Sequence, residues 1–144
     1  EVIAGLKIAG VLERIGDYAK NIARRTGQIE ARKNFEPLTL IPAMAELAGE
    51  MVHDVLTAFA ARDPQMAAEI VERDEKVDAF YNSIFRNLVS HMMENPSSIS
   101  TAAQLLFVAR NIERIGDHAT NVAEMVYYAA TGDYLSEHED TTGI

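Results

Sequence analysis

The stretch that decides the fold reads VARNIERIGDHATNVAEM, residues 108–125, and it occurs twice. The earlier copy, IAGVLERIGDYAKNIARR, covers residues 8–25 and aligns with the later one without a gap. The later copy places Glu113 and Asp117 four residues apart. In a helix this spacing puts two like charges on one face, about 5–6 Å apart, and costs a few tenths of a kcal/mol. A repeated like-charge pair indicates that another group in the folded chain offsets the repulsion.

Composition narrows the class of protein. With 144 residues, 48% of them hydrophobic, the chain is long enough to bury a core as one domain. The net charge of −9 makes nucleic acid and anionic membranes unexpected partners. The absence of Cys fits a reducing compartment, and we expect a cytoplasmic protein. No apolar run approaches the ~20 residues of a membrane span and no signal-peptide pattern is present, so we expect no membrane insertion.

Apolar residues recur at helical spacing in long stretches separated by short breaks that contain Pro. The helical stretches are residues 2–33, 38–61, 65–93 and 99–130. Asp63 followed by Pro64 predicts the start of a helix, and Gly132 is a candidate left-handed cap for the last one. The sequence therefore predicts an all-α protein, a bundle of long helices without strands.

The third helical stretch carries carboxylates on its apolar side. Its apolar arc, at about 100° per residue, is formed by Ile70, Val77, Tyr81, Ile84, Phe85 and Leu88. Asp74 falls near the middle of this arc and Asp78 at its edge, whereas Glu72 lies on the opposite side. An unpaired buried carboxylate is very costly or takes up a proton. Asp74 and Asp78 therefore require a partner.

A cation is one such partner. The short turn between the third and fourth helices predicts antiparallel packing, which places Asp74 and Asp78 opposite Glu113 and Asp117. Four carboxylates on one dry seam cannot all ionise. Magnesium, manganese, calcium or iron would resolve the conflict because these ions accept oxygen ligands. Asn121, one turn beyond Asp117, could add an amide oxygen.

A second explanation needs no metal. In this explanation the carboxylates of the fourth helix are solvated, and Asp74 and Asp78 pair with Arg110 or Arg114. Residue spacing alone leaves both explanations open.

The earlier copy of the repeat predicts half of a second site. Its ligands would be Glu13 and Asp17, and the acidic helix that faces them would precede residue 1. We therefore expect this site to be incomplete in this chain. Gly16 and Gly116 each cost about 1 kcal/mol relative to Ala inside a helix. Their presence predicts that a neighbouring helix approaches closely at both positions.

The repeated ERIGDYAKNIA and ERIGDHATNVAEM stretches resemble the signature of the PhoU family, as do VHDVLTAF at 52–59 and RDEKVD at 73–78. The resemblance extends to about residue 132 and implies units of three helices, two of which carry an acidic Glu/Asp-x-x-x-Asp pattern. We therefore expect an N-terminally truncated chain. Residues 1–34 would be the last helix of an incomplete first repeat, residues 37–132 a complete second repeat, and residues 133–144 an acidic, disordered tail.

The same resemblance implies a function and a ligand set. The residues that match a multinuclear metal cluster are Asp74, Asp78, Glu113 and Asp117, and those that match half of another are Glu13 and Asp17. Family members are associated with iron, zinc, magnesium or manganese. The implied role is a negative regulator of the phosphate-starvation response that links the ATPase subunit of the phosphate ABC transporter to the phosphate-sensing histidine kinase. The missing helices leave a face of the first helix open, which suggests a homodimer.

Two functions of other classes compete with this adaptor. One is a metal-dependent hydrolase or oxidase, which would need only the carboxylates, a metal and a water. The other is a purely structural helical bundle. The sequence has no nucleophile-and-base arrangement, no Gly-rich phosphate loop and no dinucleotide fingerprint, so we expect that the protein is not an enzyme.

Overall fold

The computed structural model describes residues 2–26 and 37–135, and every regular element within these ranges is helical. The elements are α1 (Val2–Thr26), α2 (Pro37–Ala61), α3 (Pro64–Glu94), the short 3₁₀ turn η1 (Pro96–Ser98) and α4 (Ile99–Thr131). The prediction of an all-α bundle is confirmed. The expected continuation of the first helix to residue 33 and most of the expected acidic tail lie outside the described residues.

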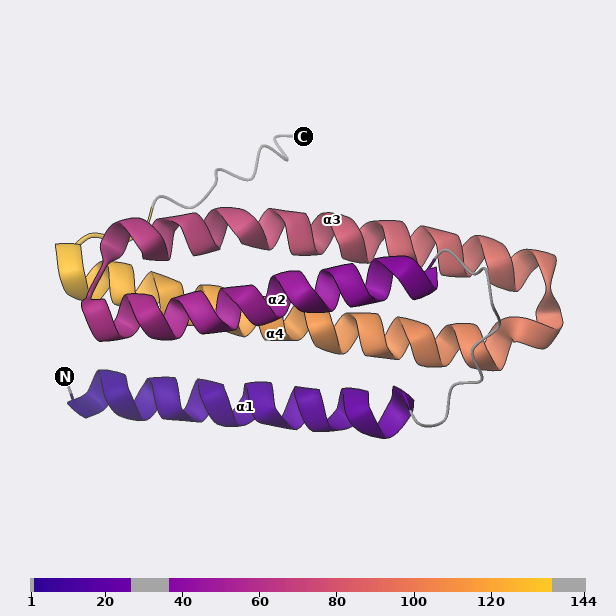
Figure 1. Ribbon diagram of the computed structural model, residues 1–144, viewed down its shortest axis with the longest axis horizontal. Coiled ribbons are helices and arrows are strands. Elements are labelled where there is room, and N and C mark those ends of the chain that lie inside the picture. Colours follow the sequence, from indigo (N-terminus) through magenta and orange to yellow (C-terminus); the bar gives the residue numbers. More distant parts are fainter. Residues whose placement is uncertain (1, 27–36, 136–144) are drawn as a thin grey trace.

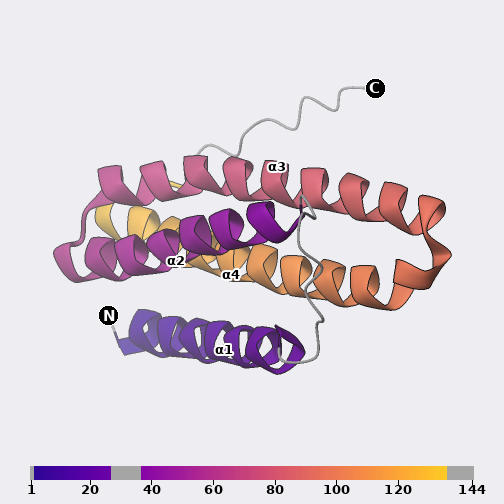
Figure 2. The same ribbon diagram turned by 45° about the vertical axis from the view of Figure 1, so that its right-hand side comes forward.

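Helix α4 is at the centre of the arrangement. It contacts α1, α2 and α3, whereas α1 contacts α4 alone among the described elements. Figure 1 shows α3 and α4 as a long antiparallel hairpin with α2 alongside, and α1 running antiparallel to α4. The turn between α3 and α4 lies beyond the ends of α1 and α2, as Figure 2 also shows. The core is therefore a three-helix bundle to which α1 adds a fourth helix.

Apolar side chains of α2, α3 and α4 fill this bundle. Its largest fully buried apolar side chains are Met44, Met51, Val55, Ile70, Val77, Ile84, Leu88 and Val122. Most of the apolar arc predicted for α3 is thus in the core, and Tyr81 is half-buried. Phe85, at the edge of that arc, remains 43% exposed.

The helix ends follow from local side-chain and backbone chemistry. Asp63 precedes α3 and its carboxylate accepts hydrogen bonds from the backbone N–H groups of Gln65 at 3.0 Å and Met66 at 3.2 Å. Pro64 occupies the first turn, where its missing N–H costs nothing. Gly132 ends α4 in the left-handed conformation, at φ 76°, and its N–H donates to the carbonyl of Tyr128. Both predicted helix caps are confirmed.

The two repeated glycines differ in their surroundings. A Cβ added at Gly116 would lie 3.3 Å from Val77 Cγ1 and 3.4 Å from Asp74 Oδ1, so the predicted close approach is confirmed there. A Cβ added at Gly16 would meet no described neighbour within 4 Å. The prediction of close packing at Gly16 is wrong for the part of the chain that the structure describes, because α1 contacts only α4 among the described helices and this glycine is exposed. Across the described residues, no helix combines the length and apolar character needed to cross a membrane.

Candidate metal centre

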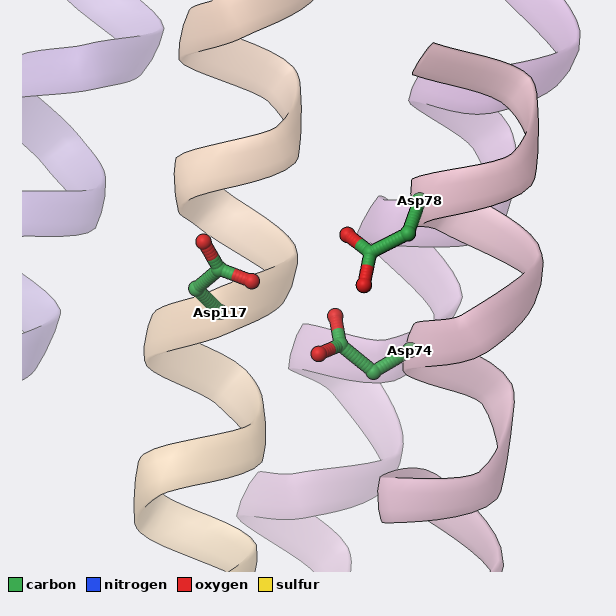
Figure 3. A group of neighbouring side chains, drawn as sticks. All are labelled: Asp74, Asp78 and Asp117. Atoms are coloured by element: carbon green, nitrogen blue, oxygen red, sulfur yellow. The ribbon is translucent and has the colours of Figure 1, made fainter. Parts of the chain in front are cut away.

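Three of the predicted ligands meet on the seam between α3 and α4. Asp74 and Asp78 extend from α3 and Asp117 extends from α4, and one carboxylate oxygen of each lies within 4.8 Å of the others. Figure 3 shows the three side chains in the space between the two helices. All three are half-buried. The antiparallel pairing predicted from the short turn therefore brings the two acidic patterns together.

The fourth predicted ligand, Glu113, is the most buried member of the cluster. Only 7% of the residue is exposed. A hydrogen bond joins it to Asp78, and the guanidinium of Arg110 donates to its Oε1. Glu113 thus lies beside the three aspartates but already has a cation of the protein as its partner.

Asp74 lacks a partner on its most buried atom. Its Oδ1 is inaccessible to solvent and has no hydrogen bond. Burial, assisted by the negative charges of Asp78 and Asp117, raises the pKa of Asp74 to about 7 from an ordinary value of 3.8. The oxygen lies close to the backbone of Gly116, where an added Cβ would be 3.4 Å away.

The rest of the cluster is also short of positive charge. Burial raises the pKa values of Asp78, Glu113 and Asp117, and the positive charge of Arg110 opposes that rise in all three. Arg110 is thus the positive group common to these three carboxylates, with Arg114 and His118 adding to it at Asp117.

The residues present fit a bound cation. The donors are carboxylate oxygens from two helices, a set that suits a hard or borderline metal ion. The unpartnered Oδ1 of Asp74 is the direct sign that a positive group would be stabilised here. Such an ion would supply the positive charge that lets the carboxylates ionise together, and it would join α3 to α4.

The explanation without a metal is wrong in the form stated above. Glu113 is buried and not solvated, and Arg110 bonds to Glu113 in place of Asp74 or Asp78. Arg114 lies over the ring of Tyr18 at 5.8 Å. The sequence contained a signal for the Arg110–Glu113 pair, because residues three apart on a helix are neighbours.

A further arginine of α3 is bound away from the cluster. Arg73 donates to the carboxylate of Asp54 on α2 at 2.6 Å, and His53 contacts the same carboxylate at 3.3 Å. This ion pair ties α2 to α3 and lowers the pKa of Asp54, chiefly through the Arg73 hydrogen bond. Arg73 is therefore engaged with Asp54, although it neighbours Asp74 in sequence.

The remaining predicted ligands do not join the centre. Asn121 is exposed, and so are Glu13 and Asp17 on α1. Within residues 2–26 and 37–135, neither acidic residue of α1 belongs to a group of three metal-ligand side chains. The second site therefore stays a prediction.

Fold and site define an all-α protein of the PhoU family. The PhoU domain matches residues 1–26 and 41–126, and the chain belongs to this family. It is 52% identical over 137 residues to the phosphate-specific transport system accessory protein PhoU homolog of Zymomonas mobilis, covering 95% of this chain and 58% of that protein. The homolog of Rhizobium meliloti is 47% identical over 133 residues, covering 92% of this chain and 56% of that protein.

Solved structures show the same fold. The crystal structure of PhoU from Pseudomonas aeruginosa matches 92% of this chain and 64% of its own with a TM-score of 0.81 and 36% identity. The phosphate transport system regulatory protein PhoU of Streptococcus pneumoniae matches 94% of this chain and 64% of its own, with a TM-score of 0.84 and 27% identity. The chain spans little more than half the length of the Zymomonas mobilis and Rhizobium meliloti relatives. Their names describe accessory and regulatory proteins of phosphate transport, in line with the expectation that the chain is not an enzyme.

Proposed function

We propose that the chain is a metal-binding part of a cytoplasmic adaptor that represses the phosphate-starvation response. Its partners would be the ATPase subunit of the phosphate ABC transporter and the phosphate-sensing histidine kinase. The relatives' names, which place them in the phosphate-specific transport system, support this role. The carboxylate seam supplies the physical basis, because metal binding would order the surface that α3 and α4 present.

The proposed ligands are Asp74, Asp78, Asp117 and, beside them, Glu113. The observation that carries the proposal is the buried, unpartnered Oδ1 of Asp74 among three further carboxylates. Iron, zinc, magnesium and manganese are the candidate ions, held singly or as a multinuclear cluster.

Metal analysis of the purified chain tests the site. Asp78→Ala and Glu113→Ala should each lower the bound metal and the affinity in a titration with Mn²⁺. Glu72→Ala is the matched control, because Glu72 is an exposed carboxylate of the same helix α3. Equal losses in all three variants would contradict the seam as the binding site. A wild-type chain that binds none of the four ions would overturn the metal proposal.

The adaptor role needs a separate test in cells. Deletion of the gene should release the repression of phosphate-starvation genes in phosphate-rich medium, and a tagged chain should retain the transporter ATPase or the sensor kinase. Asp78→Ala should weaken both effects, whereas Glu72→Ala should not. Unchanged repression after deletion would contradict the regulatory role while leaving the metal site intact.

We also propose that the chain consists of one complete three-helix repeat and part of another. Residues 37–132 would be a complete three-helix repeat, residues 1–34 the last helix of another, and Glu13 and Asp17 half of its metal site. Among the described helices, α1 contacts only α4, and this supports a homodimer in which two copies cover each other on the remaining side of α1. A monomeric mass in light scattering would contradict the dimer.

A further inference from the structure

Arg110 is the cation that the protein itself places at the carboxylate seam. It donates to Glu113 Oε1 from one turn earlier on α4. Its guanidinium carbon also lies 5.7 Å from the centre of the Tyr81 ring on α3. Its side chain is 49% exposed, whereas that of Glu113 is 9% exposed. Arg110 therefore reaches the seam from its solvent-exposed edge and has two contacts there.

The charge of Arg110 acts on the same groups that would attract a metal ion. Its guanidinium bonds to Glu113, which lies beside the three aspartates. Negative charge that Arg110 has already compensated attracts a metal less, and two cations at one site repel each other. The buried Oδ1 of Asp74 has no hydrogen-bond partner, so Arg110 does not compensate it directly.

Arg110 has a place to go when it leaves Glu113. The face of an aromatic ring attracts a guanidinium, and contacts of this kind contribute about 0.5–1 kcal/mol at exposed sites. Tyr81 already lies under the guanidinium, and water reaches the exposed half of the side chain. Breaking the contact with Glu113 would therefore not strand a buried charge on Arg110.

We propose that Arg110 is a built-in competitor of the metal, which compensates Glu113 in the metal-free protein and releases it as a ligand when a metal ion enters. This inference rests on the proposed metal-binding function and adds a control on its affinity. The three aspartates would form the first binding group, and Glu113 would join once Arg110 has released it and kept only its contact with Tyr81. The presence of Arg110 keeps binding weaker, and more easily reversed, than four carboxylates alone would allow.

A calorimetric titration of the purified full chain with Mn²⁺ tests the proposal by measuring the affinity. Arg110→Gln should tighten binding about tenfold or more, because it removes a unit charge close to the ion. Arg86→Gln is the charge-matched control: Arg86 is exposed on α3, eight residues or about 12 Å from Asp78 along the helix. The Mn²⁺ affinity of the Arg86→Gln variant should equal that of the wild type, since this distance exceeds the screening length of charges at physiological salt.

A second pair of variants asks whether Arg110 acts through Glu113. In a Glu113→Gln background, Arg110→Gln should tighten binding less than it does in the wild type, since the partner charge is already gone. If Arg110→Gln does not fold by circular dichroism, Arg110→Met carries the same expectation, because its apolar stem can still pack on Tyr81.

The outcomes separate this inference from the proposed function. Binding by the wild type together with equal or weaker binding by Arg110→Gln would overturn the competitor role, and Arg110 would then be a group that positions Glu113. Absence of binding in both proteins would overturn the metal-binding function and the competitor role with it. Binding by both proteins, tighter in Arg110→Gln than in the wild type, would support the competitor.

Discussion

Tyr18 stacks on His118 across the contact between α1 and α4, with ring centroids 5.3 Å apart and ring planes inclined by 19°. The Tyr18 hydroxyl and His118 Nε2 lie 3.3 Å apart. These residues hold the same position in the two copies of the repeated stretch. Because α1 and α4 run antiparallel (Figure 1), contact between equivalent positions creates a local two-fold axis. The duplication in the sequence is thus also a symmetry of packing.

The Tyr18–His118 stack should contribute to the attachment of α1. Tyr18→Ala and His118→Ala should each lower the free energy of unfolding in urea. A double-mutant cycle should give a coupling of about 0.5–1.5 kcal/mol, the value typical of aromatic pairs. Tyr134→Ala is the control, since Tyr134 stacks on Tyr128 but is 81% exposed; its effect should stay within about 0.5 kcal/mol. A coupling near zero would mean that the stack does not hold α1.

The glycine pair offers a test of packing at equivalent positions. Gly16→Ala should stabilise the chain, by up to about 1 kcal/mol, because Ala is the better helix former and the added Cβ meets open space. Gly116→Ala should give no such gain, because its Cβ would press on the fully buried Val77 and on Asp74. Thermal unfolding followed by circular dichroism measures both. Equal stabilisation by the two substitutions would show that Val77 yields at no cost.

The stability of the metal-free protein should depend on pH through Asp74. Its raised pKa means that between about pH 4 and 7 the folded protein holds a proton that the unfolded chain has lost. The stability that protonated Asp74 contributes to the folded protein is fully present near pH 4. It is lost as the pH rises through the folded-state pKa of about 7. Asp74→Asn, which is neutral throughout, should therefore gain stability over the wild type between pH 5 and pH 8.

The difference between wild type and variant isolates this effect. Burial, assisted by the charge of Arg14, lowers the pKa of His118. The stability that the protein owes to neutral His118 is therefore lost in the opposite direction, as the pH falls. His118 is present in both proteins and its contribution largely cancels. Urea unfolding in the presence of a chelator, repeated at several pH values, makes the measurement. A stability difference that does not change with pH would contradict the raised pKa of Asp74.

The cap at Asp63 should hold the start of α3. Asp63→Ala removes the acceptor for two backbone N–H groups and should lower the free energy of unfolding by about 1 kcal/mol. Asp133→Ala serves as the control, because Asp133 is exposed beyond the end of α4. Asp63→Asn should restore most of the loss, since its side-chain oxygen can accept the same bonds. Equal effects at both positions would contradict the capping role.

Helix positions and helix ends were predictable because their causes are local. Apolar periodicity placed α2, α3 and α4, and Asp63 and Gly132 marked ends that the structure confirms. The inward position of Asp74 followed from the wheel of a single helix. These features depend on residues within a few positions of one another, and such neighbours can be read directly from the sequence.

Other features of the site depended on which helix faces which. Gly16 was expected to pack as closely as Gly116, but a Cβ added at Gly16 would meet no described neighbour within 4 Å. Equivalent residues in a repeat do not imply equivalent surroundings, since among the described helices the first copy contacts one helix and the second contacts three.

By itself, the sequence determined an all-α chain with a duplicated acidic helix and the residues that make up the carboxylate seam. Only the tertiary structure decided that Glu113 is buried beside Asp78, that Asp74 Oδ1 is left without a partner, and that the two repeats meet at Tyr18 and His118. The physical reason is that helical periodicity arises from hydrogen bonds four residues apart. Burial and charge pairing depend instead on contacts between side chains far apart in the chain, which packing alone creates.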